Sequence, residues 1–182
     1  GDDHGKIDTA LARLRARAER EGGPGALESF QGDGGPDAQA LVAAMPALSL
    51  TATRRYLLAD GVERWSAADV KHVAGALGAL PPDLTVVLIG REEPPRKKAA
   101  KALIEAVEAA GGDVRRYDAP RARDMPRHLV AEAGRRGFTL ELDAARLLVD
   151  RMGESTVRLG AELDRLALWA EEGGVVSRED LE

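Results

Sequence analysis

The sequence has 182 residues, of which 44% are hydrophobic, so the chain can bury a core and general disorder is excluded. A formal net charge of −5 argues against a protein whose main task is to coat nucleic acid, because counterion release needs a basic surface. With no cysteine the chain forms no disulfide or thiolate metal site, and no apolar stretch approaches the roughly 18 residues that cross a bilayer.

The first sixty residues alternate between helix and strand patterns. Residues 6–21 place apolar side chains at helical spacing, and Gly22-Gly23-Pro24 ends that helix. Residues 26–30 predict a strand, a helix follows near 37–45, and residues 54–59 predict a second strand.

The next sixty residues continue the alternation. Ser66 to Asp69 form a capping box that opens a helix. Residues 84–89 are an unbroken apolar run, which is typical of a strand covered on both faces. A helix is predicted from Pro94-Pro95 to about Ala110, and a last strand at 113–117. Strands alternating with helices imply right-handed βαβ units, and therefore an α/β fold with a mainly parallel sheet.

From Asp124 onward every element is predicted to be a helix. Gly134 to Gly137 end the first, Gly173-Gly174 end the last long one, and a capping box at 177–180 opens a short final helix. We place the boundary near 118–123, which gives an α/β domain at 1–120 and a helical domain at 121–182. The two amphipathic helices of this second domain direct the following residues inward: Leu142, Ala145, Leu148 and Met152 in the first, and Leu159, Leu163, Leu166 and Ala170 in the second.

No motif predicts catalysis. Gly1 to Asp8 superficially matches a phosphate-binding loop, but three residues rather than four separate its glycines, and Ile7 stands where a Ser or Thr would hold Mg²⁺. The histidines His4, His72 and His128 are far apart and lack metal-ligand spacing. No serine lies in a nucleophile motif. We therefore expect no catalytic residue, no cofactor and no metal.

Two groups of basic residues stand out. Such groups are usually solvated faces, and the functional alternative is contact with a neighbouring subunit or with DNA phosphates. The candidates for that contact are Arg96, Lys97, Lys98 and Lys101. The full groups are Arg91, Arg96, Lys97, Lys98 and Lys101, and Arg121, Arg123, Arg127, Arg135 and Arg136.

An ordered set of motifs fills the second half of the chain. Together with the proline-rich turn and strand at 81–88 and the basic helix at 96–103, it resembles the delta subunit of the bacterial DNA polymerase III clamp loader over nearly all of the chain. In that family the lid reads Gly-Glu, Leu-x-x-Glu-Leu-x-Lys-Leu-x-Leu-Tyr, then a glycine pair. The matching residues here are Gly153-Glu154, Leu159, Glu162-Leu163, Arg165-Leu166, Leu168-Trp169 and Gly173-Gly174.

The resemblance implies a P-loop-NTPase or AAA+-like sheet domain, degenerate and without its first strand, followed by a small all-helical lid domain. It also implies a non-catalytic subunit of the DNA polymerase holoenzyme, which is a nucleotidyltransferase. Such a subunit acts in DNA replication in the bacterial cytoplasm, and no membrane is expected among its partners. Family members carry a third, collar domain after the lid, so we expect this chain to be a partial product.

In the family, a Ser-Leu-Phe motif ahead of the second strand inserts into the sliding clamp. The matching segment here is Leu48, Ser49, Leu50, Thr51 and Ala52, followed by Arg54 and Arg55. Thr51 stands where phenylalanine is usual, which should weaken the anchor, since burying one large apolar side chain stabilises by about 1.5 to 3 kcal/mol. Alternatively, Leu48 and Leu50 simply pack beneath the sheet edge, or either Leu48 or Met45 compensates for the missing ring through a rotation of the loop by one residue.

The implied partners are the beta sliding clamp, the gamma/tau and delta-prime subunits of the loader, and DNA through the assembled loader. Two other functions remain open. One is a motor-type subunit of the same loader, which would bind ATP. The other is an unrelated α/β enzyme acting on a small molecule, which would need a pocket with convergent titratable groups.

Overall fold

The structure is a computed structural model that describes residues 1–32, 34–47, 53–93, 98–170 and 173–182. The chain divides into two compact units. The first comprises residues 1–2 and 6–117, and the second comprises residues 3–5 and 118–182. No helix in the described residues is both long and apolar enough to span a bilayer.

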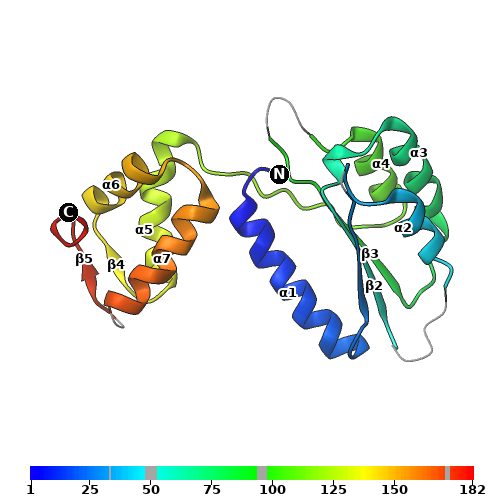
Figure 1. Ribbon diagram of the computed structural model, residues 1–182, viewed down its shortest axis with the longest axis horizontal. Helices are drawn as coiled ribbons and strands as arrows, with labels where there is room; N and C mark the ends of the chain where they lie inside the picture. The colour runs from blue at the N-terminus through cyan, green and yellow to red at the C-terminus, as the bar shows by residue number, and fades with distance from the viewer. Residues whose placement is uncertain (33, 48–52, 94–97, 171–172) are drawn as a thin grey trace. The chain divides into compact units, whose positions relative to one another are not determined.

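The first unit is built on a three-stranded parallel sheet with the order β1-β2-β3 (Figure 1). The strands are β1 (Leu27–Phe30), β2 (Arg55–Asp60) and β3 (Leu84–Ile89). The predicted strand at 84–89 is confirmed, but the expectation that it is covered on both faces is wrong. The central, fully covered strand is β2, whereas β3 lies at an edge with five of its six residues half-buried.

Helices cover both faces of this sheet, with α1 (His4–Gly22) on one side and α2, α3 and α4 on the other (Figure 1). The three helices are α2 (Ala38–Ala44), α3 (Ala67–Ala76) and α4 (Lys101–Ala109), with short 3₁₀ turns at Val62–Arg64 and Leu77–Ala79. Local signals explain their starts: Asp37 caps α2, and Ser66 and Asp69 form the predicted capping box of α3. The main core lies between the sheet and these three helices.

Two predictions for this unit are wrong. The helix that was expected from Pro94 instead begins at Lys101. Residues 98–100, which precede it, are described and are not helical. Residues 113–117, expected as a strand, are irregular. Asp113 and Arg115 pair with each other at 2.7 Å and remain exposed, as does Val114, so this segment offers too little apolar surface to join the sheet.

The second unit is mostly helical. After a 3₁₀ turn at Ala122–Asp124, it contains α5 (Met125–Arg135), α6 (Leu142–Met152) and α7 (Thr156–Ala170), and it ends in a 3₁₀ turn at Glu179–Leu181. The inward faces of these helices form a second core, whose buried residues include Met125, Leu129, Ala145, Leu148, Leu159, Leu163 and Leu166.

The expectation that this unit is all-helical is wrong. Thr139–Leu140 (β4) and Val175–Val176 (β5) form a short parallel pair in which Leu140 lies opposite Val176, and both of these side chains are buried. Gly137 and Gly173, each with a positive φ, precede the two strands. The pair was missed because two-residue strands show no alternation in sequence.

Candidate functional site

The segment that the sequence predicts to bind the sliding clamp, Leu48 to Ala52, lies outside the described residues. The residues on either side of it are described, and they are anchored to the sheet and to α1. Two described flanks border the segment, one ending at Ala47 and the other beginning at Thr53.

The flank that precedes the segment is anchored by Arg55, the first residue of β2. Its guanidinium donates to the carbonyl oxygens of Ala44 at 3.1 Å and Ala47 at 2.5 Å, and it lies 3.6 Å from a carboxylate oxygen of Glu28. The last carbonyls of a helix lack intrahelical partners, so a cation there is favourable. Arg55 thus fixes the end of α2 and the turn after it against the sheet.

The flank that follows the segment is anchored by the end of α1. The hydroxyl of Thr53 donates to the carbonyl of Glu21 at 2.9 Å. Gly22 lies so close to Arg54, the residue after Thr53, that an added Cβ would stand 2.2 Å from the carbonyl oxygen of Arg54. Only glycine permits this approach, so the last turn of α1 sets the position of Thr53 and Arg54.

A buried tyrosine links the same turn to β2. The ring of Tyr56 is buried, and its hydroxyl donates to Glu21 at 2.5 Å, while Arg17 donates to the other oxygen of Glu21 at 2.7 Å. The hydrogen bond from Tyr56, and then that from Arg17, lowers the pKa of Glu21. Burial, followed by the hydrogen bond to Glu21, raises the pKa of Tyr56.

The predicted basic contact residues are only partly described. Arg96 and Lys97 lie outside the described residues, Lys98 is exposed, and Lys101 is exposed and pairs with Glu105 at 2.9 Å. Arg91, which the sequence groups with them, points instead into the structure, where it binds Asp60 and Asp8.

Three of the five arginines in the second basic group pair with carboxylates of the second unit. Arg136 binds Asp164 at 2.7 Å and Glu132 at 2.9 Å. Arg135 also pairs with Glu132, and Arg123 pairs with Asp124 at 3.5 Å. These contacts favour the solvated-face interpretation for this group.

The described residues contain no group of three histidine or acidic side chains that could hold a metal ion. Gly5 and Lys6, which belong to the superficial phosphate-loop match, lie in the first turns of α1. His72 is exposed on α3, and His128 lies on α5. The sequence-predicted residues are therefore not brought together into a catalytic arrangement within the described parts of the chain.

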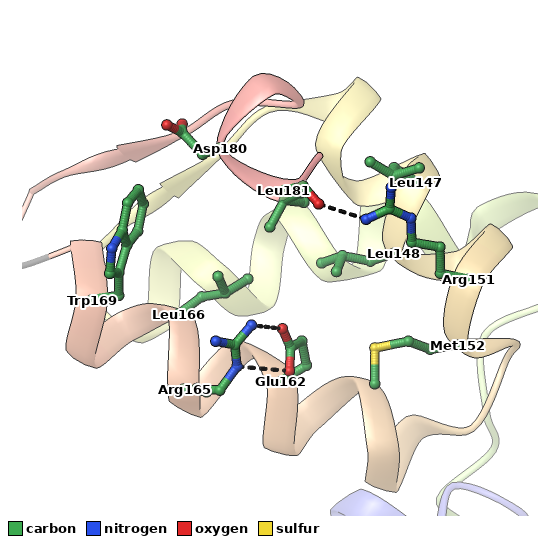
Figure 2. A pocket seen from close by; sticks show the side chains of 10 residues that line it. All are labelled: Leu147, Leu148, Arg151, Met152, Glu162, Arg165, Leu166, Trp169, Asp180 and Leu181. Carbon is green, nitrogen blue, oxygen red and sulfur yellow. Dashed lines mark hydrogen bonds and ion pairs between the residues drawn. The ribbon is translucent and has the colours of Figure 1, made fainter.

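The second unit carries a groove that the sequence did not predict. It lies between α6, α7 and the C-terminal 3₁₀ turn. Arg151 donates to the carbonyl of Leu181 at 2.5 Å, and Arg165 donates to Glu162 (Figure 2). Trp169 lines it and is 59% exposed, and the neighbouring Leu168 is 87% exposed. The sequence did contain one indication of an apolar surface here, because Leu168 and Trp169 do not share the helical spacing of the inward residues of α7. The residues that line the groove are Leu147, Leu148, Arg151, Met152, Glu162, Arg165, Leu166, Trp169, Asp180 and Leu181.

Comparison with known proteins gives a match at the level of the fold. No family model matches the chain, and no curated protein matches it in sequence. Among solved structures, the Bacillus subtilis DNA clamp loader delta protein (YqeN) is similar, with a TM-score of 0.64 and 16% sequence identity. The match covers 100% of this chain and 55% of that protein, so the chain spans about half of its length. At this identity the likeness shows a shared mixed α/β fold.

Proposed function

We propose that this chain is a delta-type, non-catalytic subunit of a bacterial DNA clamp loader. The observation that carries the proposal is the similarity to the clamp loader delta protein over the whole of the chain. The similarity includes both compact units in their order along the sequence, rather than a sheet domain alone. The motif order from Gly153-Glu154 to Gly173-Gly174 supports the same subunit independently of the fold.

The first unit is proposed to be a degenerate AAA+-like domain, and the second to be its lid. The proposed partners are the sliding clamp, the other loader subunits and, through the assembled loader, DNA in the bacterial cytoplasm. Binding of ATP is not part of this function. A nucleotide titration of the chain that gave saturable ATP binding would favour a motor-type subunit instead.

We assign clamp binding to Leu48, Ser49, Leu50, Thr51 and Ala52. The anchored flanks support this assignment, because Arg55 and Thr53 fix the chain on both sides of the segment. Fixed ends lower the entropy lost when a short segment binds a partner. A segment that binds the open form of the ring better than the closed form shifts the clamp toward opening, since only differential affinity moves such an equilibrium.

The decisive experiment measures binding of the 182-residue chain to a bacterial sliding clamp by surface plasmon resonance. Leu50→Ala should abolish detectable binding, and Thr51→Phe should strengthen binding by about tenfold or more, since an added buried ring contributes about 1.5 to 3 kcal/mol. Leu168→Ala is the matched control, because Leu168 is an exposed leucine of the second unit. Equal binding by the parent chain and Leu50→Ala would refute the site, and absence of clamp binding by both the parent chain and Thr51→Phe would refute the function.

A further inference from the structure

The sheet of the first unit has two edges with different chemistry. Among the described residues, β1 and β3 each pair with β2 and with no further strand. The edge strand β1 has four residues and carries the exposed, charged Glu28, and a short strand with a charge is a common form of edge protection. The edge strand β3 has six residues and reads LTVVLI, without a charge or a proline. One edge is therefore protected and the other is not.

The outer side of β3 presents backbone groups at alternate residues. The amide of Gly61 donates to the carbonyl of Ile89 at 2.8 Å, and this bond sets the phase of the ladder between β2 and β3. In a parallel pair every second residue bonds to the same neighbouring strand. The N–H and C=O groups of Val86 and Leu88 therefore point away from β2, toward the side on which no strand lies in the described parts of the chain. We refer to this side as the open edge of β3.

The side chains of β3 are apolar toward both faces of the sheet. Val86 and Leu88 pack against the main core, which lies beneath α2, α3 and α4. Val87 and Ile89 alternate with them along the strand, so they lie on the face that α1 covers (Figure 1). All four are half-buried. A strand beside β3 would lie between the same two layers, so it needs apolar side chains on both of its faces.

Gly1 shows in which direction a chain lies along this side. Its backbone nitrogen donates to the carbonyl of Gly90 at 3.3 Å, and its carbonyl accepts from the amide of Glu92 at 2.9 Å. Bonds from one residue to two residues that stand two positions apart are the parallel pattern, whereas an antiparallel pair exchanges both bonds with one residue. Gly90 and Glu92 have the same phase as Val86 and Leu88. Gly1 therefore lies at the end of the open edge and is paired in parallel.

We propose that the open edge of β3 binds an extended, uncharged apolar segment of a partner polypeptide, which adds a fourth, parallel strand to the sheet. Main-chain hydrogen bonds to Val86 and Leu88 provide the affinity, and alternating apolar side chains that enter the two layers provide the specificity. A second copy of this chain fits less well, because a two-fold pair of β3 edges is antiparallel. Strand addition and clamp binding are separate properties, and either can fail without the other.

The test is fluorescence anisotropy of the 182-residue chain with a labelled, end-capped peptide of alternating valine and leucine, about six residues long like an average strand. Every second amide nitrogen of this peptide is methylated, so it keeps one hydrogen-bonding edge and does not stack with itself. It should bind saturably. The same peptide methylated at every amide has no donor, and it should bind about tenfold more weakly or worse. Equal binding by the two peptides, or no saturable binding by the first, would overturn the proposal.

Two proline variants locate the binding edge. Val86→Pro removes an amide from the open edge of β3 and should lower the affinity for the peptide by about tenfold or more. Ser29→Pro is the matched control, because the amide of Ser29 points away from β2 on the opposite edge of the sheet, and it should leave the affinity unchanged. Circular dichroism checks that both variants are folded. Equal losses in the two folded variants would place the peptide elsewhere and contradict the proposal.

The direction of the added strand is tested on the parent chain, without a variant. A nitroxide at the carboxyl end of the peptide should broaden the amide signals of Leu88 and Gly90 more than that of Leu84, because a parallel strand ends beside Gly90. Stronger broadening of Leu84 would mean antiparallel pairing and would contradict the proposal. Sedimentation of the parent chain as a dimer that the peptide does not dissociate would assign the open edge to a second copy instead.

Discussion

Arg91 binds both carboxylate oxygens of Asp60, with Nε to Oδ1 at 2.8 Å and Nη2 to Oδ2 at 2.9 Å. Asp60 is the last residue of β2, and Arg91 follows the end of β3. The same Nη2 contacts Asp8 of α1 at 2.7 Å, and the backbone amide of Arg91 donates to Glu63 at 2.8 Å. One side chain therefore joins α1 to the carboxyl end of the sheet, and its hydrogen bonds to Asp60 are the main reason that its pKa is raised.

Arg91→Ala should lower the free energy of unfolding by about 1 to 3 kcal/mol, because it leaves the carboxylates of Asp60 and Asp8 close together without their shared cation. Urea unfolding at neutral pH, followed by circular dichroism, measures the change. Arg91→Lys should restore only part of the loss, since an ammonium group cannot reproduce the two parallel bonds. Arg115→Ala is the control, because its pair with Asp113 is exposed and should contribute less than about 1 kcal/mol.

The link between Tyr56 and Glu21 predicts an altered tyrosine titration. The sequence has two tyrosines, so in Tyr117→Phe the tyrosinate absorbance reports Tyr56 alone. Its pKa should lie above the ordinary value of 10.0, chiefly because the ring is buried. Adding Glu21→Gln should lower that pKa but not return it fully, since burial remains. A titration at the ordinary value in Tyr117→Phe would contradict the hydrogen bond and the burial together.

The same pair sets the direction of two pH effects on stability. The pKa of Glu21 is lowered by folding, so its contribution is present above the pKa of an unfolded glutamate and is lost as pH falls through the lowered value. The pKa of Tyr56 is raised, so its contribution is present below the pKa of an unfolded tyrosine and is lost as pH rises through the raised value. Tyr56→Phe should therefore flatten the stability profile at both ends, as measured by urea midpoints across pH.

Two glycines in helices should respond in opposite directions to the same substitution. Gly22→Ala places a Cβ 2.2 Å from the carbonyl of Arg54 and 2.5 Å from the Cβ of Ala26, so the last turn of α1 must move and stability should fall. Gly75→Ala places a Cβ in open space inside α3 and should stabilise by about 0.5 to 1 kcal/mol through helix propensity. Equal effects in thermal unfolding would show that the approach of Gly22 to Arg54 is not tight.

Local signals in the sequence were sufficient to predict most helix starts and the strands of the first unit. Ser66 and Asp69 cap α3 as expected, and the apolar run at 84–89 is a strand with those bounds. The order of strands is a different matter, because it depends on pairing between distant segments. LTVVLI was expected to be covered on both faces, yet RYLLAD of β2 occupies the centre of the sheet. Residues 113–117, expected as a further strand, are irregular, so β3 lies at the edge.

The candidate site was predictable only as a segment of sequence. The anchoring role of Arg55 depends on the turn after α2 returning two carbonyls to its guanidinium, from residues eight and eleven positions earlier in the chain. Arg91 shows the reverse error, since its place in a basic run indicated an unpaired surface cation, whereas the fold pairs it with the partly buried Asp60 and with the more exposed Asp8. Neither contact has a periodicity or spacing that a single sequence displays.

The two faces of α7 provide a final prediction, on the core of the second unit. Leu163 is 1% exposed and packs with Leu159 and Leu166, whereas Leu168 is 87% exposed on the same helix. Leu163→Ala should lower the free energy of unfolding by about 2 to 5 kcal/mol, because it removes buried methyl groups and leaves a cavity. Leu168→Ala makes the identical chemical change without burial and should shift stability by less than about 0.5 kcal/mol. Both are measured by urea unfolding followed by circular dichroism. A large loss in Leu168→Ala would mean that this leucine is covered in solution, and a small loss in Leu163→Ala would mean that the inward face of α7 is assigned incorrectly.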